Sequence, residues 1–313
     1  MNTPHKPVLY KEIIHALQPH SPGYYVDGTL GAGGHARGIL EACAPDGRLL
    51  GLDVDPQALA LARETLAPYG ERVQMVQASY ESLTVQLSAL GWDAVDGILL
   101  DLGASSMQFD TPERGFSFLQ DGPLDMRFGP TAPRTAEELV NYLSQDELAE
   151  LIFHYGEERD SRRIARAIVK ARPLHTTREL VTVIEAVSPP RRPFGKLRAG
   201  RIHPATRTFQ ALRIAVNEEL AAVENVLPQA VAALRPGGRL AVISFHSLED
   251  RIVKDFFRSQ SKDLVNPPFE RIYEVERKAT LKEINRKPIT PTEEEAQENP
   301  RARSAKLRIV EKL

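Results

Sequence analysis

The sequence has only one cysteine among its 313 residues. Cys43 therefore cannot form a disulfide within the chain and has no cysteine partner for a zinc site, which excludes a small disulfide-stapled fold and favours a reducing compartment. The sequence also lacks a run of about 18 consecutive apolar residues, and its first residues contain no apolar signal core. We therefore expect neither a membrane span nor a secretory signal, but a cytoplasmic protein.

The composition excludes disorder and fibres for the chain as a whole, because 42% of the residues are hydrophobic and 26% are charged. The length predicts two compact units or one large one. The net charge is −2, yet residues 156–203 hold twelve Lys or Arg against five Asp or Glu, and residues 301–313 hold five against one. Such local basicity on an otherwise acidic chain indicates a defined contact with a polyanion.

Short apolar runs alternate with helix-like stretches in the first third of the chain, which predicts a parallel α/β sheet. The predicted strands span 24–30, 48–54, 73–78 and 96–102, and the predicted helices span 34–43, 56–67 and 80–90. This alternation stops after residue 103, where Gly, Pro and Asp are too dense for regular structure.

Helical patterns then dominate, and strand signals return only near the end of the chain. The predicted helices span 135–143, 145–155, 158–171, 176–187 and about 205–234, with a basic loop before the last. The predicted late strands span 238–245, 305–311 and, more weakly, 271–276. The simplest architecture is one α/β domain made from residues 1–107 and 205–313, with a mostly helical domain, residues 108–204, inserted after the fourth strand.

A glycine-rich loop, DGTLGAGGH, follows the first predicted strand. Gly31, Gly33 and Gly34 allow a tight turn and a close approach of a ligand to the backbone amides at the start of the next helix. Asp53 ends the second strand, where a carboxylate can accept hydrogen bonds from ribose hydroxyls. A nucleoside-containing cofactor is therefore expected. The stretch from Gly31 to Ala36 also satisfies G-x-G-x-x-A, so a nicotinamide dinucleotide stays open on this motif alone.

Two further features favour S-adenosylmethionine over a dinucleotide. Asp27 precedes the loop in a D-G-x-x-G-x-G-G arrangement, which resembles the first motif of Rossmann-like methyltransferases. The fourth strand ends in Asp101, Leu102 and Gly103, where such methyltransferases place the residues that face the transferred methyl group. No Tyr-x-x-x-Lys pair is present for hydride chemistry.

Longer strings extend the resemblance across nearly the whole chain. Among them are HKPVLYKE, DGILLDLGASSMQFD, YGEERDSRRIARAIV, HPATRTFQALRIAVNEEL and PGGRLAVISFHSLEDRIVK. The chain resembles the bacterial 16S ribosomal RNA cytosine-N4 methyltransferase family called RsmH or MraW. The resemblance implies a Rossmann-like class I methyltransferase sheet and methylation of a cytosine amine in the decoding region, with S-adenosylmethionine as donor. Ala104 and Met107 stand where the family more often has Val and Pro.

The resemblance also implies roles for single residues. Tyr80 would pack on the adenine ring, while Asp101 and Gln108 would flank the methionine end of the cofactor. Two alternatives stay open: Tyr80 could be a core aromatic, and His35 could direct its side chain into solvent. The implied cofactor-binding residues are Gly33, Gly34, His35, Asp53, Tyr80, Asp101 and Gln108.

Methyl transfer to a cytosine amine needs in-line positioning and an acceptor near the amine hydrogens, because the amine lone pair is delocalised into the ring. The expected pocket edge combines Asp101 with Ser105, Ser106 and Gln108. His246, with Ser244 and Ser247, is the second choice on the same edge of the sheet, although His246 could equally be structural. No metal is expected.

A target base must leave its stack to reach such a pocket, so a surface that grips RNA is required. Five basic residues fall within an arc of about 100° on the helix predicted over 158–171: Arg159, Arg162, Arg163, Arg166 and Lys170. The opposite face carries Ile164, Ala167, Ile168 and Ala171. Arg191 and Arg192 extend the basic surface into the following loop, although a merely solvated helix face remains an alternative.

The resemblance implies that the partner is 16S ribosomal RNA, within the small ribosomal subunit. A second function stays open beside catalysis. The chain could be a non-catalytic ribosomal RNA-binding assembly factor that retains a nucleoside pocket.

Overall fold

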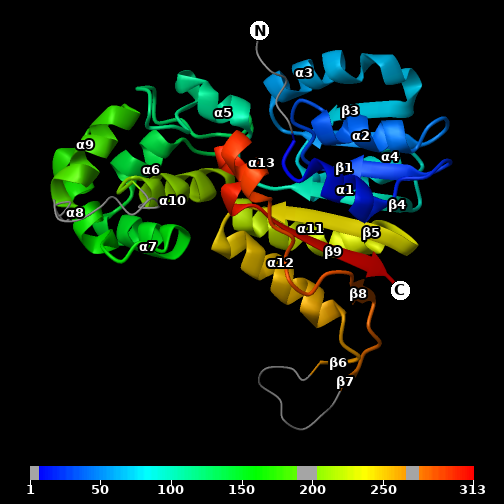
Figure 1. Cartoon of the computed structure of the whole chain (residues 1–313). Coiled ribbons are helices and arrows are strands. Elements are labelled where there is room, and N and C mark those ends of the chain that lie inside the picture. The colour runs from blue at the N-terminus through cyan, green and yellow to red at the C-terminus, as the bar shows by residue number, and fades with distance from the viewer. Residues whose placement is uncertain (1–6, 189–202, 266–274) are drawn as a thin grey trace. The chain divides into compact units, whose positions relative to one another are not determined.

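The computed structural model describes residues 7–188, 203–265 and 275–313, which form two compact units (Figure 1). Unit 1 comprises residues 1–103 and 220–313, and unit 2 comprises residues 104–219. The sequence placed the second boundary earlier, after residue 204. The structure differs there because helix α10 (Thr206–Asn217) packs on helix α7 (Gln145–Gly156) and contributes Phe209 and Leu212 to the core of unit 2.

Unit 1 is built on a seven-stranded sheet with the order β3-β2-β1-β4-β5-β9-β8. The first five strands in chain order are parallel, whereas β9 pairs antiparallel with both β5 and β8. This mixed sheet confirms the predicted α/β, Rossmann-like class. The strands are β1 (Tyr24–Asp27), β2 (Arg48–Asp53), β3 (Val73–Gln77), β4 (Val95–Asp101), β5 (Leu234–Ser244), β8 (Leu281–Glu283) and β9 (Lys306–Lys312).

Helices cover both faces of this sheet. Leu49 and Leu99 join the core under one set of helices, while their neighbours Leu50 and Leu100 join the core under the other set. Strands buried on both faces explain why the sequence shows continuous apolar runs instead of alternation. One face carries α1 (Tyr10–Leu17), α2 (Gly34–Ala42) and α3 (Pro56–Leu66), and the other carries α4 (Leu83–Ala89), α11 (Glu219–Ala233) and α12 (Ser247–Gln260).

The C-terminal part of unit 1 differs from the prediction of a sheet strand near 271–276. In the described part of that stretch, β7 (Val275–Glu276) pairs with β6 (Leu264–Val265) in a separate two-stranded sheet, and residues 266–274 lie outside the described residues. The edge of the main sheet is β8 instead, with Lys282 opposite Glu311. A strand of three residues gives almost no periodic signal in a sequence. The short helix α13 (Glu293–Glu298) precedes β9.

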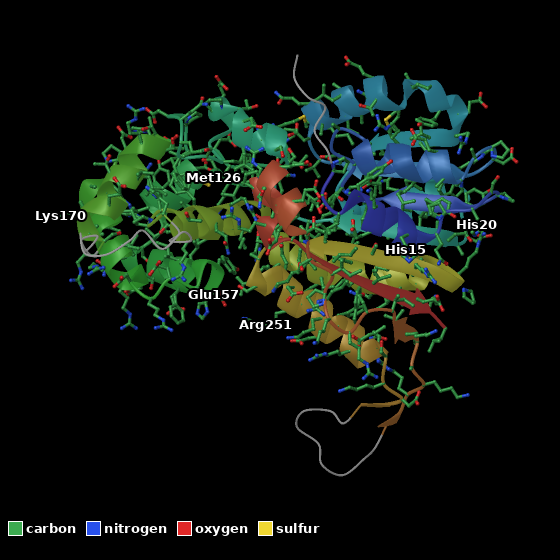
Figure 2. All side chains as sticks on the ribbon, in the orientation of Figure 1. His15, His20, Met126, Glu157, Lys170 and Arg251 are labelled. Carbon is green, nitrogen blue, oxygen red and sulfur yellow. The ribbon has the colours of Figure 1, made fainter. Side chains whose placement is uncertain are left out.

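The single helix predicted over 205–234 is two helices, α10 and α11. Glu218 separates them with a left-handed φ of 49°. The side chain of Asn217 fixes the end of α10, because its Oδ1 accepts a hydrogen bond of 2.7 Å from the Phe128 N–H and its Nδ2 donates one of 2.8 Å to the Met126 carbonyl. Met126 is labelled in Figure 2 within unit 2. The break at Glu218 coincides with the boundary between the two units.

Unit 2 is helical, as predicted. Its helices are α5 (Ser106–Asp110), α6 (Ala136–Tyr142), α7, α8 (Ser161–Ala171), α9 (Thr177–Val187) and α10. Capping boxes start α5, α6, α7 and α9 at Ser105, Thr135, Ser144 and Thr176. Residues 115–135 form neither a helix nor an extended strand, which confirms the prediction from their glycine and proline content. Within the described ranges of both units, no helix is long and apolar enough to cross a membrane.

Candidate functional site

Three strands of unit 1 end in an aspartate at the same edge of the sheet. Asp27 ends β1, Asp53 ends β2 and Asp101 ends β4, and these strands are parallel neighbours. The carboxyl ends of parallel strands form the usual ligand crevice of open α/β sheets. Burial raises the pKa of all three carboxyls, to about 7 for Asp27 and about 8 for Asp101. Such shifts mark a candidate functional site.

The predicted glycine loop lies between β1 and α2, beside this row of acids. Gly31 and Gly33 have positive φ values of 53° and 82°, which glycine adopts without strain. Among the described residues, no side chain caps the start of α2 at Gly33, and the first amide groups of a helix are a common place for a ligand to bind. A Cβ atom at Gly34 would meet Pro7 at 2.5 Å, so the loop also needs a glycine there for packing.

Asp53 ties the end of β2 to this loop. Its Oδ2 accepts a hydrogen bond of 2.8 Å from the Gly31 N–H, and its Oδ1 accepts one of 2.8 Å from the Asp55 N–H. The Val54 backbone also donates to this carboxyl. An ionised carboxylate has about four acceptor positions, so these bonds leave room for a hydroxyl group of a ligand. The arrangement fits the ribose-binding role that the sequence predicts, and it adds a second task, which is to hold the loop in place.

His35 lies inside unit 1 and not in solvent, so the solvent-exposed alternative is wrong. It is 6% exposed, and its ring stacks on Tyr10 with centroids 6.2 Å apart. Its Nε2 lies 3.7 Å from Oδ2 of Asp101. The first turn of α2 therefore places His35 against the acid at the end of β4.

Tyr80 starts the short 3-10 helix η2 (Tyr80–Ser82) after β3 and is half-buried. It packs on the hydrophobic core beneath α4 and α11. Its Cβ also lies next to Gly28 of the glycine loop, where an added Cβ atom would approach it to 3.2 Å. Tyr80 is thus partly a core aromatic, and it also borders the loop.

Asp101 has an acceptor atom that the described residues do not use. Its Oδ1 is buried and receives no hydrogen bond from any described residue. Burial is the largest cause of its raised pKa, followed by the negative charges of Asp27 and Glu249. A buried carboxyl oxygen without a donor is costly unless a ligand supplies one.

A comparison with known proteins identifies the family. A family model described as the MraW methylase family matches residues 2–313. The chain belongs to the MraW methylase family. The protein named Ribosomal RNA small subunit methyltransferase H from Heliobacterium mobile is 50% identical over 313 residues and covers 99% of each chain. The protein of the same name from Geobacter sulfurreducens is 52% identical over 321 residues and covers 100% of each chain.

Membership of the MraW methylase family confirms the predicted family and the prediction of an S-adenosylmethionine-dependent methyltransferase. The nicotinamide alternative, which the glycine loop alone leaves open, is not favoured. The residues of unit 1 fit the methyl donor. The room left on Asp53 suits a ribose hydroxyl, and the unused Oδ1 of Asp101 suits a donor group of the ligand or of the substrate.

The other residues predicted beside Asp101 in this MraW methylase, Ser105 and Gln108, belong to unit 2. They form the capping box of α5: the Gln108 side chain accepts a hydrogen bond of 2.9 Å from the Ser105 N–H, and the Ser105 hydroxyl accepts one of 3.3 Å from the Gln108 N–H. Both therefore shape the start of α5. Their predicted contact with the methionine end of the cofactor stays a prediction.

His246 follows β5 and caps α12. Its Nδ1 accepts a hydrogen bond of 3.4 Å from the Glu249 N–H, and its Nε2 lies 3.1 Å from Oε1 of Glu249. Glu249 in turn accepts a hydrogen bond of 2.9 Å from the Phe245 N–H. His246 thus has a capping role, while its buried Nε2 has no hydrogen-bond partner among the described residues. Its predicted catalytic role stays a prediction.

The predicted cationic face of α8 is present. Four of the five basic residues, Arg162, Arg163, Arg166 and Lys170, lie on α8, whereas Arg159 lies in the turn before it, because the helix begins at Ser161 and not at residue 158 as predicted. All five are exposed, and Figure 2 labels Lys170 on this helix. Arg163 pairs with Asp160 at 3.0 Å. The opposite face differs in detail, because Ala171 at the end of the helix is exposed and Ala165 is buried beside Ile164 and Ile168. Arg191 and Arg192 lie outside the described residues.

Two residues had no predicted site role but lie at the acidic edge, the edge of the sheet where Asp27, Asp53 and Asp101 end their strands. Asp27 is fully buried, and Thr29 contacts both Asp27 and Asp101. The D-G-x-x-G-x-G-G string places Asp27 before the loop but says nothing of its burial. No sequence signal points to Thr29.

Proposed function

We propose that this MraW methylase transfers a methyl group from S-adenosylmethionine to the exocyclic N4 amine of a cytosine in the decoding region of 16S ribosomal RNA. The observation that carries the proposal is the acidic edge of unit 1. There, Asp53 holds the glycine loop through Gly31, and Asp101 offers an unused buried oxygen. The names of the curated relatives, Ribosomal RNA small subunit methyltransferase H, support this substrate.

The sulfonium group of the donor supplies an electrophilic methyl, so the protein has mainly to position the reactants. In this proposal Asp53 and the loop from Gly31 to His35 bind the nucleoside part of the cofactor. Asp101 accepts a hydrogen bond from the target amine, which draws its lone pair out of conjugation with the ring, and takes up the surplus proton after transfer. Its raised pKa suits a base that works near neutral pH.

The inserted unit supplies the grip on RNA in this proposal. Arg162, Arg166 and Lys170 lie on one exposed face of α8, and no described residue forms an ion pair with them. Unpaired basic side chains are free to contact phosphates, which position a nucleic acid on a protein. The substrate would be the RNA within the small ribosomal subunit, in the cytoplasm.

The alternative is an assembly factor that binds ribosomal RNA without catalysis. It is not favoured, because the chain belongs to a methylase family over its whole length and retains both Asp53 and Asp101. The two functions differ in one observable, which is the appearance of a methylated nucleoside.

The test is incubation of the protein with labelled S-adenosylmethionine and with small subunits from cells that lack the enzyme. We expect label on one N4-methylated cytidine of the 16S RNA, and much less label with Asp101→Asn. Label on another base or on protein would overturn the proposed substrate. Cofactor binding without any transfer to subunits or naked RNA would support the assembly-factor alternative.

A further inference from the structure

One fully buried acid of unit 1 has no role in the proposed reaction. Asp27 is 1% exposed. Burial is the largest effect on the pKa of its carboxyl and raises it; the hydrogen bond from the Thr29 N–H lowers this pKa, and the negative charge of Asp53 raises it further. Within the described ranges, no Lys, Arg or His forms an ion pair with it. A buried, ionisable group without a basic partner is costly to a fold. Asp27 is therefore a candidate for a function.

Thr29 connects this acid to Asp101. The Thr29 N–H donates a hydrogen bond of 3.1 Å to Oδ1 of Asp27, and the Thr29 hydroxyl oxygen lies 3.5 Å from the same Oδ1. The same hydroxyl accepts a hydrogen bond of 2.7 Å from the Asp101 N–H. Because a hydroxyl that accepts one hydrogen bond can still donate its own proton, that proton can point to Asp27. One side chain thus links the ends of β1 and β4.

The ionisable groups around Asp101 come from three elements. Asp27 on β1 and Glu249 on α12 raise its pKa through their negative charge, after the larger effect of burial. His35 on α2 lies 3.7 Å away. No described Lys or Arg forms an ion pair with Asp101. Glu249 is engaged in capping α12, whereas the hydrogen bonds of Asp27 within the described residues come from Thr29.

We propose that Thr29 and Asp27 are positioning residues for Asp101. The Thr29 hydroxyl holds the backbone N–H of Asp101, and the carboxyl of Asp27 lies beside that same hydroxyl. The inference rests on the proposed function for the reaction itself. In that reaction the carbon–sulfur bond breaks with its electron pair left on sulfur, a carbon–nitrogen bond forms from the amine lone pair, and the surplus amine proton passes to the ionised Asp101. A neighbouring acid increases the affinity of Asp101 for this proton.

The first experiment compares Thr29→Val, which removes the hydroxyl at nearly constant shape, with Thr29→Ser, which retains it. We expect Thr29→Val to lower turnover about tenfold or more and to shift the midpoint of its pH profile, and Thr29→Ser to restore both. Binding of S-adenosylhomocysteine, measured by calorimetry, should change by less than about threefold in both variants, because positioning of the base affects turnover and not ground-state binding. A loss of turnover that serine does not restore, without a pH shift, would make Thr29 merely structural.

The second experiment needs no activity. The Cγ resonance of Asp101 is titrated by carbon-13 NMR in the cofactor-free protein, with Asp101→Asn for its assignment. We expect Asp27→Asn to lower the midpoint by about one pH unit or more, because it removes a neighbouring negative charge. Asp93→Asn, an exposed acid before β4, is the matched control and should leave the midpoint unchanged.

An unchanged midpoint in Asp27→Asn would overturn the role of Asp27. This outcome is distinct from a failure of the proposed function. If the wild-type protein methylates no ribosomal RNA, the proposed function fails, whereas the titration still decides whether Asp27 acts on Asp101.

Discussion

The carboxylate of Asp53 accepts a hydrogen bond of 2.8 Å from the backbone N–H of Gly31. The bond joins the end of β2 to the loop that follows β1, and Gly31 has the positive φ that this loop requires. Asp53, which the sequence predicts to bind ribose, thus also holds the cofactor loop in place. Substitutions of Asp53 should therefore affect binding in two ways.

We predict that Asp53→Ala weakens the binding of S-adenosylhomocysteine by about 1–3 kcal/mol, the usual cost of leaving buried polar partners unpaired. Calorimetry at neutral pH measures this loss. Asp93→Ala, which removes an exposed acid of the same unit, is the control and should bind like the wild type. An Asp53→Ala variant with wild-type affinity would remove Asp53 from the site.

The sequence predicts two acids of this edge because their signals are local. Apolar runs end at Asp53 and Asp101 and mark the ends of parallel strands, and the glycine spacing marks the loop, whereas Asp27 falls inside the strand predicted over residues 24–30. The hydrogen bond from Gly31 to Asp53 is not local, because it depends on the register of β1 with β2. Sequence spacing brings the two residues to one edge but does not reveal which atoms meet.

The errors of prediction have equally specific causes. The break at Glu218 went unseen because a non-glycine residue in the left-handed region leaves no pattern in the sequence. The capping box of Ser105 and Gln108 was missed although the spacing S-x-x-Q is a capping signature, and the predicted place of the two residues at the pocket edge stays a prediction. In both places a local feature of the helix ends decides the structure.

We predict that Asp101→Asn lowers methyl transfer about a hundredfold or more while cofactor binding changes little, because the variant keeps the shape and removes the proton acceptor. Single-turnover rates with labelled donor measure the effect. Thermal unfolding should show a folded variant. An Asp101→Asn variant that transfers methyl groups at the wild-type rate would refute the role of the carboxylate.

The same substitution should change how the stability of the cofactor-free protein depends on pH. The pKa of Asp101 is raised to about 8 in the folded state, mainly by burial, from an ordinary value near 4. A raised pKa means that the folded state binds the proton more tightly than the unfolded state does, so protonation of Asp101 stabilises the fold. This stabilisation is fully present below the ordinary value and is lost as the pH rises through about 8.

Denaturant unfolding between pH 5 and pH 9, a range of about four units that lies above the ordinary value and includes the raised one, should therefore show the wild type losing stability relative to Asp101→Asn. The difference should grow up to about pH 8 and then level off. Parallel curves for the two proteins would show that Asp101 is not held in its protonated form.

Two substitutions of Gln108 separate its structural and functional roles. Gln108→Ala removes the acceptor for the Ser105 N–H and should destabilise α5 by about 0.5–2 kcal/mol. Gln108→Glu retains that acceptor, since glutamate also closes a capping box. If Gln108 also contacts the methionine end of the cofactor, Gln108→Glu should fold normally and bind S-adenosylhomocysteine more weakly. Normal binding by a stable Gln108→Glu variant would leave only the capping role.

The last prediction concerns the exposed cationic face of α8. Arg162 and Arg166 form no ion pair with a described residue, whereas Arg163 is engaged with Asp160. Replacing both free arginines by glutamate leaves the buried Ile164 and Ile168 unchanged, so the helix should keep its packing. Each lost phosphate contact should reduce the slope of log affinity against log salt concentration by about 0.7–0.9.

Filter binding of 16S RNA over a salt series measures the slope. Calorimetry of the same double variant should show unchanged cofactor affinity, because none of the predicted cofactor-binding residues lies on α8. The double variant Arg63→Glu and Arg258→Glu has the same change in net charge on exposed helices of unit 1 and is the matched control. A general effect of charge would lower RNA affinity equally in both. A slope that stays at the wild-type value in Arg162→Glu and Arg166→Glu would show that this face is only solvated, and would move the RNA contact to another basic segment, such as residues 301–313.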